Sequence, residues 1–477
     1  MKVLKVVIVL VFMSQFVLGE TINVREMGAK GDGKTIDTKA IQAAVDKCAE
    51  TGGKVLLTGG TFLTGTIFLK SNVTLVVEKG AVVLGSLNLE DYPINKFGFN
   101  NLNTSRVNRA LIYASGMTNV GIEGSGIIDG QGGSFVQALK LVRPFLLWFK
   151  ECKKVNVEKI ELRNSAMWMQ YYVHCEDVRI SDIKVFNHGN SNNDMLDIDG
   201  CRNVIIDGVI GDTDDDGITF KSMDTCINEN IIVSNCIIGS HCNGLKFGTE
   251  TTGGFRNVTI TNCVIRSSVV DSVDSGCREG TSGISLEIVD GGIMENINIS
   301  NIMIDGPRVP LFVRLGNRAR KYYSEAPQPP IGQMKNIRIS NITARSSKTI
   351  IGIAILGIPG GLIEQISLSG IKLILPGGGS REDAMFLVPE NIDRYPDASE
   401  FGGFGRFSSC GLYARHVKGL VLSDINFEFL EKDARPLMFF DDVHNSKIRD
   451  ITVSENHLFE KYKIEKNCKN LIIQDKQ

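Results

Sequence analysis

The chain has 477 residues, of which 43% are hydrophobic and 22% are charged, a composition typical of a globular protein. Its formal net charge of −2 gives no electrostatic basis for binding nucleic acid. The 11 cysteines are an odd number, so in an exported protein at least one of them is unpaired or joins another chain.

The first element of the chain has the pattern of a secretory signal peptide. Lys2 and Lys5 precede an apolar run that ends near Leu18, and the small residue Gly19 follows it. This run is shorter than the roughly 20 residues that a helix needs to span a bilayer. We therefore expect removal of residues 1–19, a secreted or periplasmic mature protein, and no membrane attachment after cleavage.

Residues 38–50, TKAIQAAVDKCAE, predict a short amphipathic helix. Its apolar residues recur with helical spacing at Ile41, Ala44, Val45 and Cys48. The preceding stretch, GAKGDGKTIDT, is a turn cluster that ends in Asp37 or Thr38 as the helix N-cap. This stretch lacks the residue spacing of a phosphate-binding loop.

One phrase recurs along the chain with alternating apolar and polar residues. Copies such as VRISDIKV, VTITNCV and IRISNIT begin at Val178, Val204, Ile231, Val258, Ile297 and Ile337. Their period of two is that of a β-strand, and their spacing of 26 or 27 residues, lengthened to 39 and 40 later, predicts stacked coils that carry loops. The fold that fits is a parallel β-helix, capped at its N-terminal end by residues 38–50.

Each copy contains a turn residue that tolerates a left-handed backbone. These residues are Asp182, Gly208, Asn235, Asn262, Asn301 and Asn341. Stacked asparagine side chains also form hydrogen bonds along the axis of a repeated structure. The turn positions therefore support the β-helix.

Two acidic stretches lie about one coil apart. NSNNDMLDIDG contains Asp194, and GDTDDDGITFKS contains Asp215 and Asp216. The strands that follow them have inward-facing residues at Leu196, Ile198, Ile218 and Phe220. Because successive coils lie in register, we expect the three carboxylates to meet in one groove on the outer surface.

Three carboxylates in one groove suit glycoside hydrolysis. One protonated acid donates to the leaving oxygen, and its neighbours raise its pKa and activate water. A calcium-dependent polysaccharide lyase stays open as an alternative, with Lys221 or Lys246 as its base, because Ca²⁺ favours clustered carboxylate oxygens. A non-catalytic glycan-binding β-helix is the third interpretation.

At these residues the chain resembles glycoside hydrolase family 28, the polygalacturonase group. NNDMLDI matches the first family motif through Asn192 and Asp194, and DDGITFKS matches the second through Asp215 and Asp216. The resemblance implies a right-handed parallel β-helix that hydrolyses pectin-type polysaccharide or oligosaccharide with inversion and without an organic cofactor or metal. It also implies that Asp215 is the general acid, and that Asp194 and Asp216 hold and activate the water.

Two later motifs of the family are altered in this chain. Asn243 in HCNGLKFG stands where the family has histidine, and SGISLEI places Ser285 and Glu287 where the family has a basic pair. Lys246, Arg278 or Arg314 could supply the missing positive charge, and Glu287 is a further candidate substrate-binding residue. The altered subsite favours an acidic or branched pectic glycan over unmodified polygalacturonan.

The C-terminal third interrupts the repeat once. Residues 375–412 are rich in Gly, Pro and charge, and they predict either a flap over a substrate pocket or a loop that packs on a coil. The repeat resumes at Leu420, so we expect residues 20–477 to form a single catalytic domain. Trp148 and Trp168 lie in apolar runs and are expected in the core rather than stacked on sugar.

Overall fold

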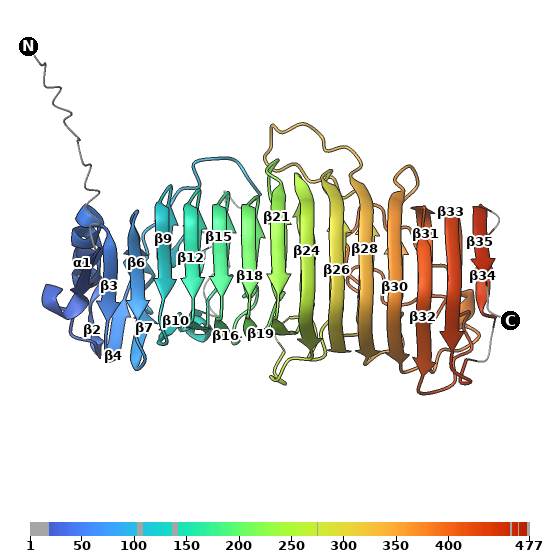
Figure 1. Cartoon of the computed structure of the whole chain (residues 1–477), viewed down its shortest axis with the longest axis horizontal. Helices are drawn as coiled ribbons and strands as arrows, with labels where there is room; N and C mark the ends of the chain where they lie inside the picture. Colours follow the sequence, from blue (N-terminus) through green and yellow to red (C-terminus); the bar gives the residue numbers. More distant parts are fainter. Residues whose placement is uncertain are drawn as a thin grey trace, which may run out of the picture.

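The computed structural model describes residues 19–102, 108–135, 142–273, 275–457, 460–465 and 467–474. Residues 1–18 of the expected signal peptide lie outside this range. The described chain forms an elongated stack of coils with the N-terminal helix at one end and the C-terminal strands at the other (Figure 1). Among the described residues, no helix has the length and apolar character needed to cross a bilayer.

The 35 strands pair in parallel and fall into three ladders along the stack. The first ladder contains β1 (Glu20–Asn23), β3 (Gly53–Leu57), β6 (Val73–Val77), β9 (Thr118–Glu123), β12 (Lys153–Glu158), β15 (Glu176–Ser181), β18 (Arg202–Asp207), β21 (Asn228–Ser234), β24 (Gly254–Arg266), β26 (Ile293–Gly306), β28 (Gln333–Ser346), β30 (Ile363–Leu375), the start of β32 (Val421–Phe429), β33 (Met438–Val453) and β35 (Lys469–Gln474). The second contains β2 (Asp32–Ile36), β4 (Gly60–Thr64), β7 (Ala81–Gly85), β10 (Ile127–Asp129), β13 (Glu161–Arg163), β16 (Lys184–Asn187), β19 (Ile210–Thr213) and β22 (Ile237–Ser240), and it continues through the second halves of the long strands and β32 (Val421–Phe429).

The third ladder carries the functional residues and is called the pocket ladder below. It contains β5 (Ile67–Phe68), β8 (Ala110–Ser115), β11 (Phe145–Lys150), β14 (Gln170–Val173), β17 (Leu196–Asp199), β20 (Ile218–Ser222), β23 (Asn243–Thr251), β25 (Ser282–Ile288), β27 (Val309–Leu315), β29 (Ile353–Leu356), β31 (Leu412–Lys418), the start of β33, and β34 (Tyr462–Ile464). Three short strands per coil, all parallel, make the fold a right-handed parallel β-helix.

The repeat predicted from the sequence is confirmed residue by residue. The first strand of each copy pairs with the next in the order Val178, Val204, Ile231, Val258, Ile297 and Ile337. The predicted inward residues Leu196, Ile198, Ile218 and Phe220 are fully buried in the central core. Stacking coils in this register removes the apolar face of every strand from water, which stabilises the fold.

The N-terminal helix α1 (Thr38–Thr51) covers the open end of the stack, as Figure 1 shows. The apolar residues expected to face the core are all buried, namely Ile41, Ala44, Val45 and Cys48. Asp37 occupies the N-cap position without capping the helix by its side chain. Its carboxylate instead accepts the backbone N–H groups of Lys30 at 2.7 Å and Gly31 at 2.9 Å, which closes the preceding turn.

The predicted turn residues adopt the left-handed conformation, with φ between 54° and 67°. A second asparagine column, absent from the sequence-based prediction, runs along the first ladder. Its members are Asn203, Asn230, Asn257, Asn296 and Asn336, and each Nδ2 after the first donates to the preceding Oδ1 at 2.7–3.2 Å. All of them have φ near 57°, a conformation that costs other L-residues about 1–2 kcal/mol.

Replacing one member of this column tests its contribution to stability. We expect Asn257→Ala to lower the free energy of unfolding by about 1–3 kcal/mol, because a left-handed alanine is strained and two side-chain hydrogen bonds are lost. Asn257→Gly removes the same hydrogen bonds without the strain, so its loss should be smaller. Urea denaturation of the two variants measures the difference, and equal losses would contradict the role of the left-handed backbone.

Residues 376–411 leave the coil between β30 and β31 and contain one 3-10 turn, η5 (Asp383–Met385). Phe404 and Phe407 pack with Phe312 of the pocket ladder in a separate apolar cluster. The same segment also lines the pocket described below. It therefore packs on the coils as a loop and also forms part of a pocket wall. All 11 cysteines are free thiols, and Cys236 and Cys263 are buried.

Candidate active site

A pocket of about 860 Å³ lies over the pocket ladder. Its floor comes from the loops that precede β17 and β20 and from the start of β23. Six of the eight site residues predicted from the sequence line it: Asn192, Asp194, Asp215, Asp216, Asn243 and Lys246. The expected convergence of the acids follows from the stacking, because Leu196 pairs with Ile218 and thereby places the two preceding loops side by side.

Asp215 is the most accessible of the three acids. Its Oδ1 accepts the backbone N–H of Asp216 at 2.9 Å, and its Oδ2 lies 3.4 Å from the Asn192 amide nitrogen. Ser240 donates to its carbonyl oxygen at 2.6 Å, which fixes the backbone. Burial and the adjacent charge of Asp216 raise the pKa of Asp215, so this carboxyl group is suited to hold a proton.

The surroundings of Asp216 favour its ionised form, in contrast to those of Asp215. Its Oδ2 lies 2.8 Å from the Lys246 Nζ, and its Oδ1 accepts the Asn243 side-chain amide at 2.7 Å and backbone N–H at 3.2 Å. Burial alone would raise its pKa, but the charges of Lys246 and Lys221 and these hydrogen bonds outweigh it, and the pKa of Asp216 is lowered. The pKa of Asp216 is thus lowered and that of the adjacent Asp215 is raised, so the proton is held more readily by Asp215 than by Asp216.

Asp194 completes the group and is held by Lys221. The Lys221 Nζ lies 3.3 Å from the Asp194 Oδ2, 3.4 Å from Asp197 and 3.8 Å from Glu250, and 4.7 Å above the ring centre of Trp168. Burial raises the pKa of Asp194 to about 7, with Lys221 opposing the shift and the other two acids adding to it. The site thus holds three coupled carboxylates and two buried ammonium groups.

Arg314 does not line the pocket, which corrects its predicted role in substrate binding. Its side chain is buried, and its guanidinium donates to the carbonyl oxygens of Gly357, Glu390 and Asn391 at 2.7–3.1 Å. These contacts engage both terminal nitrogens of the guanidinium. Arg314 therefore anchors the segment 376–411 to the coils.

Glu287 also lies outside the pocket lining, beneath its floor. It is 1% exposed, Ser285 donates to its Oε1 at 2.6 Å, and its Oε2 has no hydrogen-bond partner. Burial raises its pKa to about 8, although Lys246 opposes the shift. The predicted contact with substrate is therefore not formed in this structure, and Glu287 is a neutral, buried carboxylic acid.

The raised pKa of Glu287 predicts a pH-dependent stability. The folded state keeps a proton on this group up to pH about 8, whereas the unfolded chain loses it near its usual value of 4.5. Its stabilising contribution is therefore complete below the unfolded pKa and is lost as the pH rises toward 8. Between pH about 5 and about 8, we expect the free energy of unfolding of the wild type to fall relative to that of Glu287→Gln. Urea denaturation of both proteins at several pH values measures this difference. A difference that does not change with pH would contradict the prediction.

Sequence reasoning missed the residues that later loops bring to the pocket. Arg308, Arg318, Arg320 and Lys348 come from around β27 and β28, and Tyr395 and Asp397 come from the segment 376–411. Arg318 pairs with buried Asp290, and Arg320 pairs with Glu250 at 2.8 Å. The basic run NRARK was visible in the sequence, but it follows a strand instead of lying on one, so the repeat gave no register for it.

The two tryptophans differ from each other. Trp148 is buried among aromatic side chains outside the main core, as expected, with Tyr171 stacked on it. Trp168 is also largely buried, but one edge lines the pocket. His241 follows β22 and is fully buried.

Three groups of His, Cys, Asp and Glu in the described part of the chain are close enough to share an ion. They are Asp215–Asp216–Cys242, His188–Asp214–His241 and His174–Asp224–Cys226. Each includes a sulfur or nitrogen donor, whereas Ca²⁺ prefers oxygen ligands alone. In the pocket, Lys221 and Lys246 already supply positive charge to the acids.

The fold and the acidic pocket define a class, the β-helix proteins that act on or bind carbohydrate. Residues 69–389 match the profile of glycosyl hydrolases family 28, and the chain belongs to this family. It is 31% identical over 212 residues to a probable polygalacturonase of Vitis vinifera, an alignment that covers 41% of this chain and 43% of the relative. It is 38% identical over 120 residues to an exo-poly-α-D-galacturonosidase of Dickeya chrysanthemi, covering 24% and 20%.

The aligned stretches thus span less than half the length of these curated relatives. Among solved structures, the exopolygalacturonase of Thermotoga maritima superposes with a TM-score of 0.63 at 23% identity, over 74% of this chain and 87% of that one. The family 28 exopolygalacturonase of Yersinia enterocolitica gives 0.62 at 18% identity, over 95% and 78%. These two likenesses confirm the predicted fold.

Proposed function

We propose that this protein is a glycoside hydrolase that cleaves galacturonate-containing pectic polysaccharide or oligosaccharide with inversion. The observation that carries the proposal is the meeting of Asp194, Asp215 and Asp216 on the floor of one pocket. Membership of family 28 and the names of the Vitis vinifera and Dickeya chrysanthemi relatives, which both refer to galacturonan, support the same substrate class.

The environments of the acids suggest their roles. Asp215 has a raised pKa and keeps some access to the pocket, so it donates a proton to the leaving oxygen. Asp216 remains ionised through Lys246, and with Asp194 it orients and deprotonates the attacking water. Asn192 and Asn243 hold two of these carboxylates through their side-chain amides.

The positive side chains of the pocket fit an acidic sugar. The basic pair expected on β25 is absent, but Lys246 lies one coil earlier and pairs in register with Ser285, the first of the two replaced positions. Arg318 and Arg320 reach the same pocket from the loop after β27. Acidic side chains partly neutralise these positive groups. The positive groups can still form ion pairs with the carboxylates of an acidic glycan, and a neutral glycan cannot form such pairs.

We further propose cleavage from a chain end. The segment 376–411 adds Tyr395, Asp397 and Phe401 to the pocket wall, so that the site is enclosed on the side of this segment. Several relatives carry the prefix exo in their names. An enclosed site admits the end of a polymer more readily than its middle, and digestion should therefore release small products while the polymer shortens slowly.

A product analysis on polygalacturonate, its oligomers and branched pectic glycans tests this function. We expect new reducing ends, no ultraviolet-absorbing unsaturated product, and a first-formed anomer opposite to that of the cleaved bond. An absorbing product that disappears with a calcium chelator would instead show a lyase. Binding to a glycan without any cleavage would show a lectin-like β-helix.

A further inference from the structure

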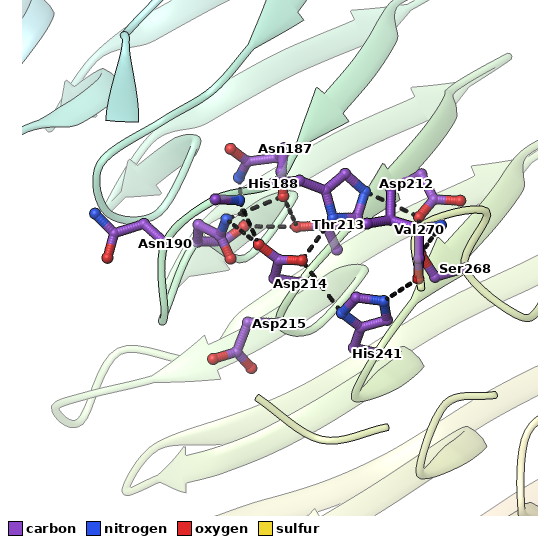
Figure 2. A network of polar contacts seen from close by, with 12 residues as sticks. Asn187, His188, Asn190, Asp212, Thr213, Asp214, Asp215, His241, Ser268 and Val270 are labelled. Atoms are coloured by element: carbon purple, nitrogen blue, oxygen red, sulfur yellow. Dashed lines mark hydrogen bonds and ion pairs between the residues drawn. The ribbon is translucent and has the colours of Figure 1, made fainter. Parts of the chain in front are cut away.

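A buried group of two histidines and two aspartates lies directly behind the acids, and is called the histidine–aspartate cluster. It comprises His188 after β16, Asp212 in β19, Asp214 after β19 and His241 after β22, on three successive coils (Figure 2). Their side chains are 0–8% exposed. Asp212 and Asp214 belong to the acidic stretch GDTDDDGITFKS, whereas the two histidines were not among the site residues predicted from the sequence.

Both ring nitrogens of His188 face carboxylate oxygens. Nδ1 lies 2.6 Å from the Asp214 Oδ1, and Nε2 lies 3.1 Å from the Asp212 Oδ1. An ionised carboxylate only accepts hydrogen bonds, so both nitrogens donate and the ring carries a positive charge. Burial opposes this charge, but the hydrogen bonds that the ring donates to the two carboxylates raise the pKa of His188 to about 9.

The remaining groups around His188 complete the charge balance. Arg266 pairs with Asp212 at 2.6 Å, and Ser268 donates to it at 2.5 Å. His241 lies on the other side of Asp214, with its Nδ1 3.2 Å from the Asp214 Oδ1 and its Nε2 2.9 Å from the Val270 carbonyl oxygen. Of the two histidines that contact Asp214, His188 is the nearer, at 2.6 Å against 3.2 Å for His241.

Asp214 links this cluster to the catalytic loop. Its Oδ2 accepts the backbone N–H of Gly189 at 2.7 Å and the Asn193 side-chain amide at 3.3 Å. Both residues belong to the loop 189–194, which precedes β17 and also carries Asn192 and Asp194. Asp214 also directly precedes Asp215 in the loop before β20 (Figure 2), so one carboxylate joins the loop of Asp194 to the loop of Asp215.

We propose that His188 is a positioning residue for the hydrolysis: it fixes the Asp214 carboxylate, which in turn sets the loop 189–194, and with it Asp194, against Asp215. This inference rests on the proposed function for its kinetic part, while its structural part is independent of activity. The cluster needs no ion for this role, because each histidine nitrogen already faces a protein acceptor.

His188→Gln tests the proposal, because glutamine keeps a polar side chain but no charge. Hydrogen–deuterium exchange of the peptide spanning 188–195 should accelerate by about tenfold or more, since Gly189 loses a fixed acceptor. His174→Gln is the matched control: His174 is also paired with an aspartate, Asp224, at 3.0 Å, but it lies outside the pocket. We expect this control to leave both the exchange of 188–195 and the turnover unchanged.

Kinetics supply the second readout. We expect His188→Gln to lower kcat by about 10²-fold with a change in KM of less than about threefold, as for a misplaced catalytic group. Loss of the nearby positive charge should also raise the pKa of Asp215, so the alkaline limb of the pH–rate profile moves to higher pH. A purely structural loss would lower activity at every pH without moving this limb.

A double variant covers the case in which the single variant does not fold. His188→Gln with Asp214→Asn removes the unpaired buried charge, so it should fold while the loop stays loosened. Unchanged exchange of 188–195 in whichever variant folds would overturn the proposal, even if the protein proved to have another activity. One equivalent of a transition metal in the purified wild type, lost in His188→Gln, would overturn it in favour of a metal centre.

Discussion

Asp215→Asn is expected to reduce turnover by about 10²–10⁴-fold, the usual contribution of a general acid. Asparagine has nearly the same shape, so it keeps the hydrogen bond from the Asp216 N–H and leaves the pocket intact. It has no proton to donate to the leaving oxygen, and this is the reason for the loss. Reducing-end assays on the preferred pectic glycan measure the effect, with circular dichroism as the check on folding.

Asp182→Asn provides a matched control for this substitution. Asp182 is exposed on an outer turn with φ of 54°, and the equivalent turns of other coils contain asparagine. We therefore expect full activity and unchanged stability in this variant. Retained turnover in Asp215→Asn, with activity lost instead in the control, would contradict the role given to Asp215.

Lys246→Met is expected to have the second-largest effect, on both activity and stability. Lys246 is 3% exposed and lies 2.8 Å from Asp216, so its removal leaves a buried, unpaired carboxylate. Breaking such a pair costs about 3–5 kcal/mol in the free energy of unfolding. Urea denaturation measures this loss, and we expect turnover to fall by about 10²-fold or more because Asp216 is no longer held ionised.

The pH dependence distinguishes this explanation from simple loss of packing. Lys246 lowers the pKa of Asp216, so without Lys246 this pKa rises and the active, ionised form is lost at a higher pH. The acidic limb of the pH–rate profile should therefore move upward in Lys246→Met. Lys246→Arg keeps the charge and should keep the limb near its original position, and a shift in both variants would argue against this role.

The fold could be predicted largely from the sequence because a β-helix repeats one local rule. A period of two, a turn residue that accepts a left-handed backbone, and a constant spacing together determine the pairing of Val178 with Val204 and of each later copy. The second asparagine column was missed because Asn230 in β21 and Asn257 in β24 lie just before the recurring phrases, which begin at Ile231 and Val258. Their regularity appears only once the coils are aligned.

The site was predictable only where it follows the repeat. Asp194 and Asp215 lie at corresponding points of neighbouring coils, so their convergence could be inferred from register. Arg314 also follows the register, but the segment 376–411, which begins 62 residues further on, returns over its coil and accepts hydrogen bonds from its guanidinium, and no local pattern predicts such a contact. Arg318 and Tyr395 reach the pocket from loops and were missed for the same reason.

Glu287 illustrates how the surroundings of a residue change its chemistry. Its position on β25 suggested a charged group facing substrate, since alternate residues of the strand face outward. The outer face of the pocket ladder is covered here, however, so Ser285 and Glu287 are as deeply buried as core residues. A carboxyl group in that environment keeps its proton, and the sequence alone does not reveal the cover.

The central claim is that Asp194, Asp215 and Asp216 surround the bond that is broken. The most direct test is a crystal structure of Asp215→Asn soaked with an oligogalacturonide that the wild type cleaves. We predict a glycosidic oxygen within hydrogen-bonding distance of residue 215 and a water molecule held between Asp194 and Asp216. An oligosaccharide bound on another face of the β-helix, with this pocket filled by solvent alone, would contradict the claim.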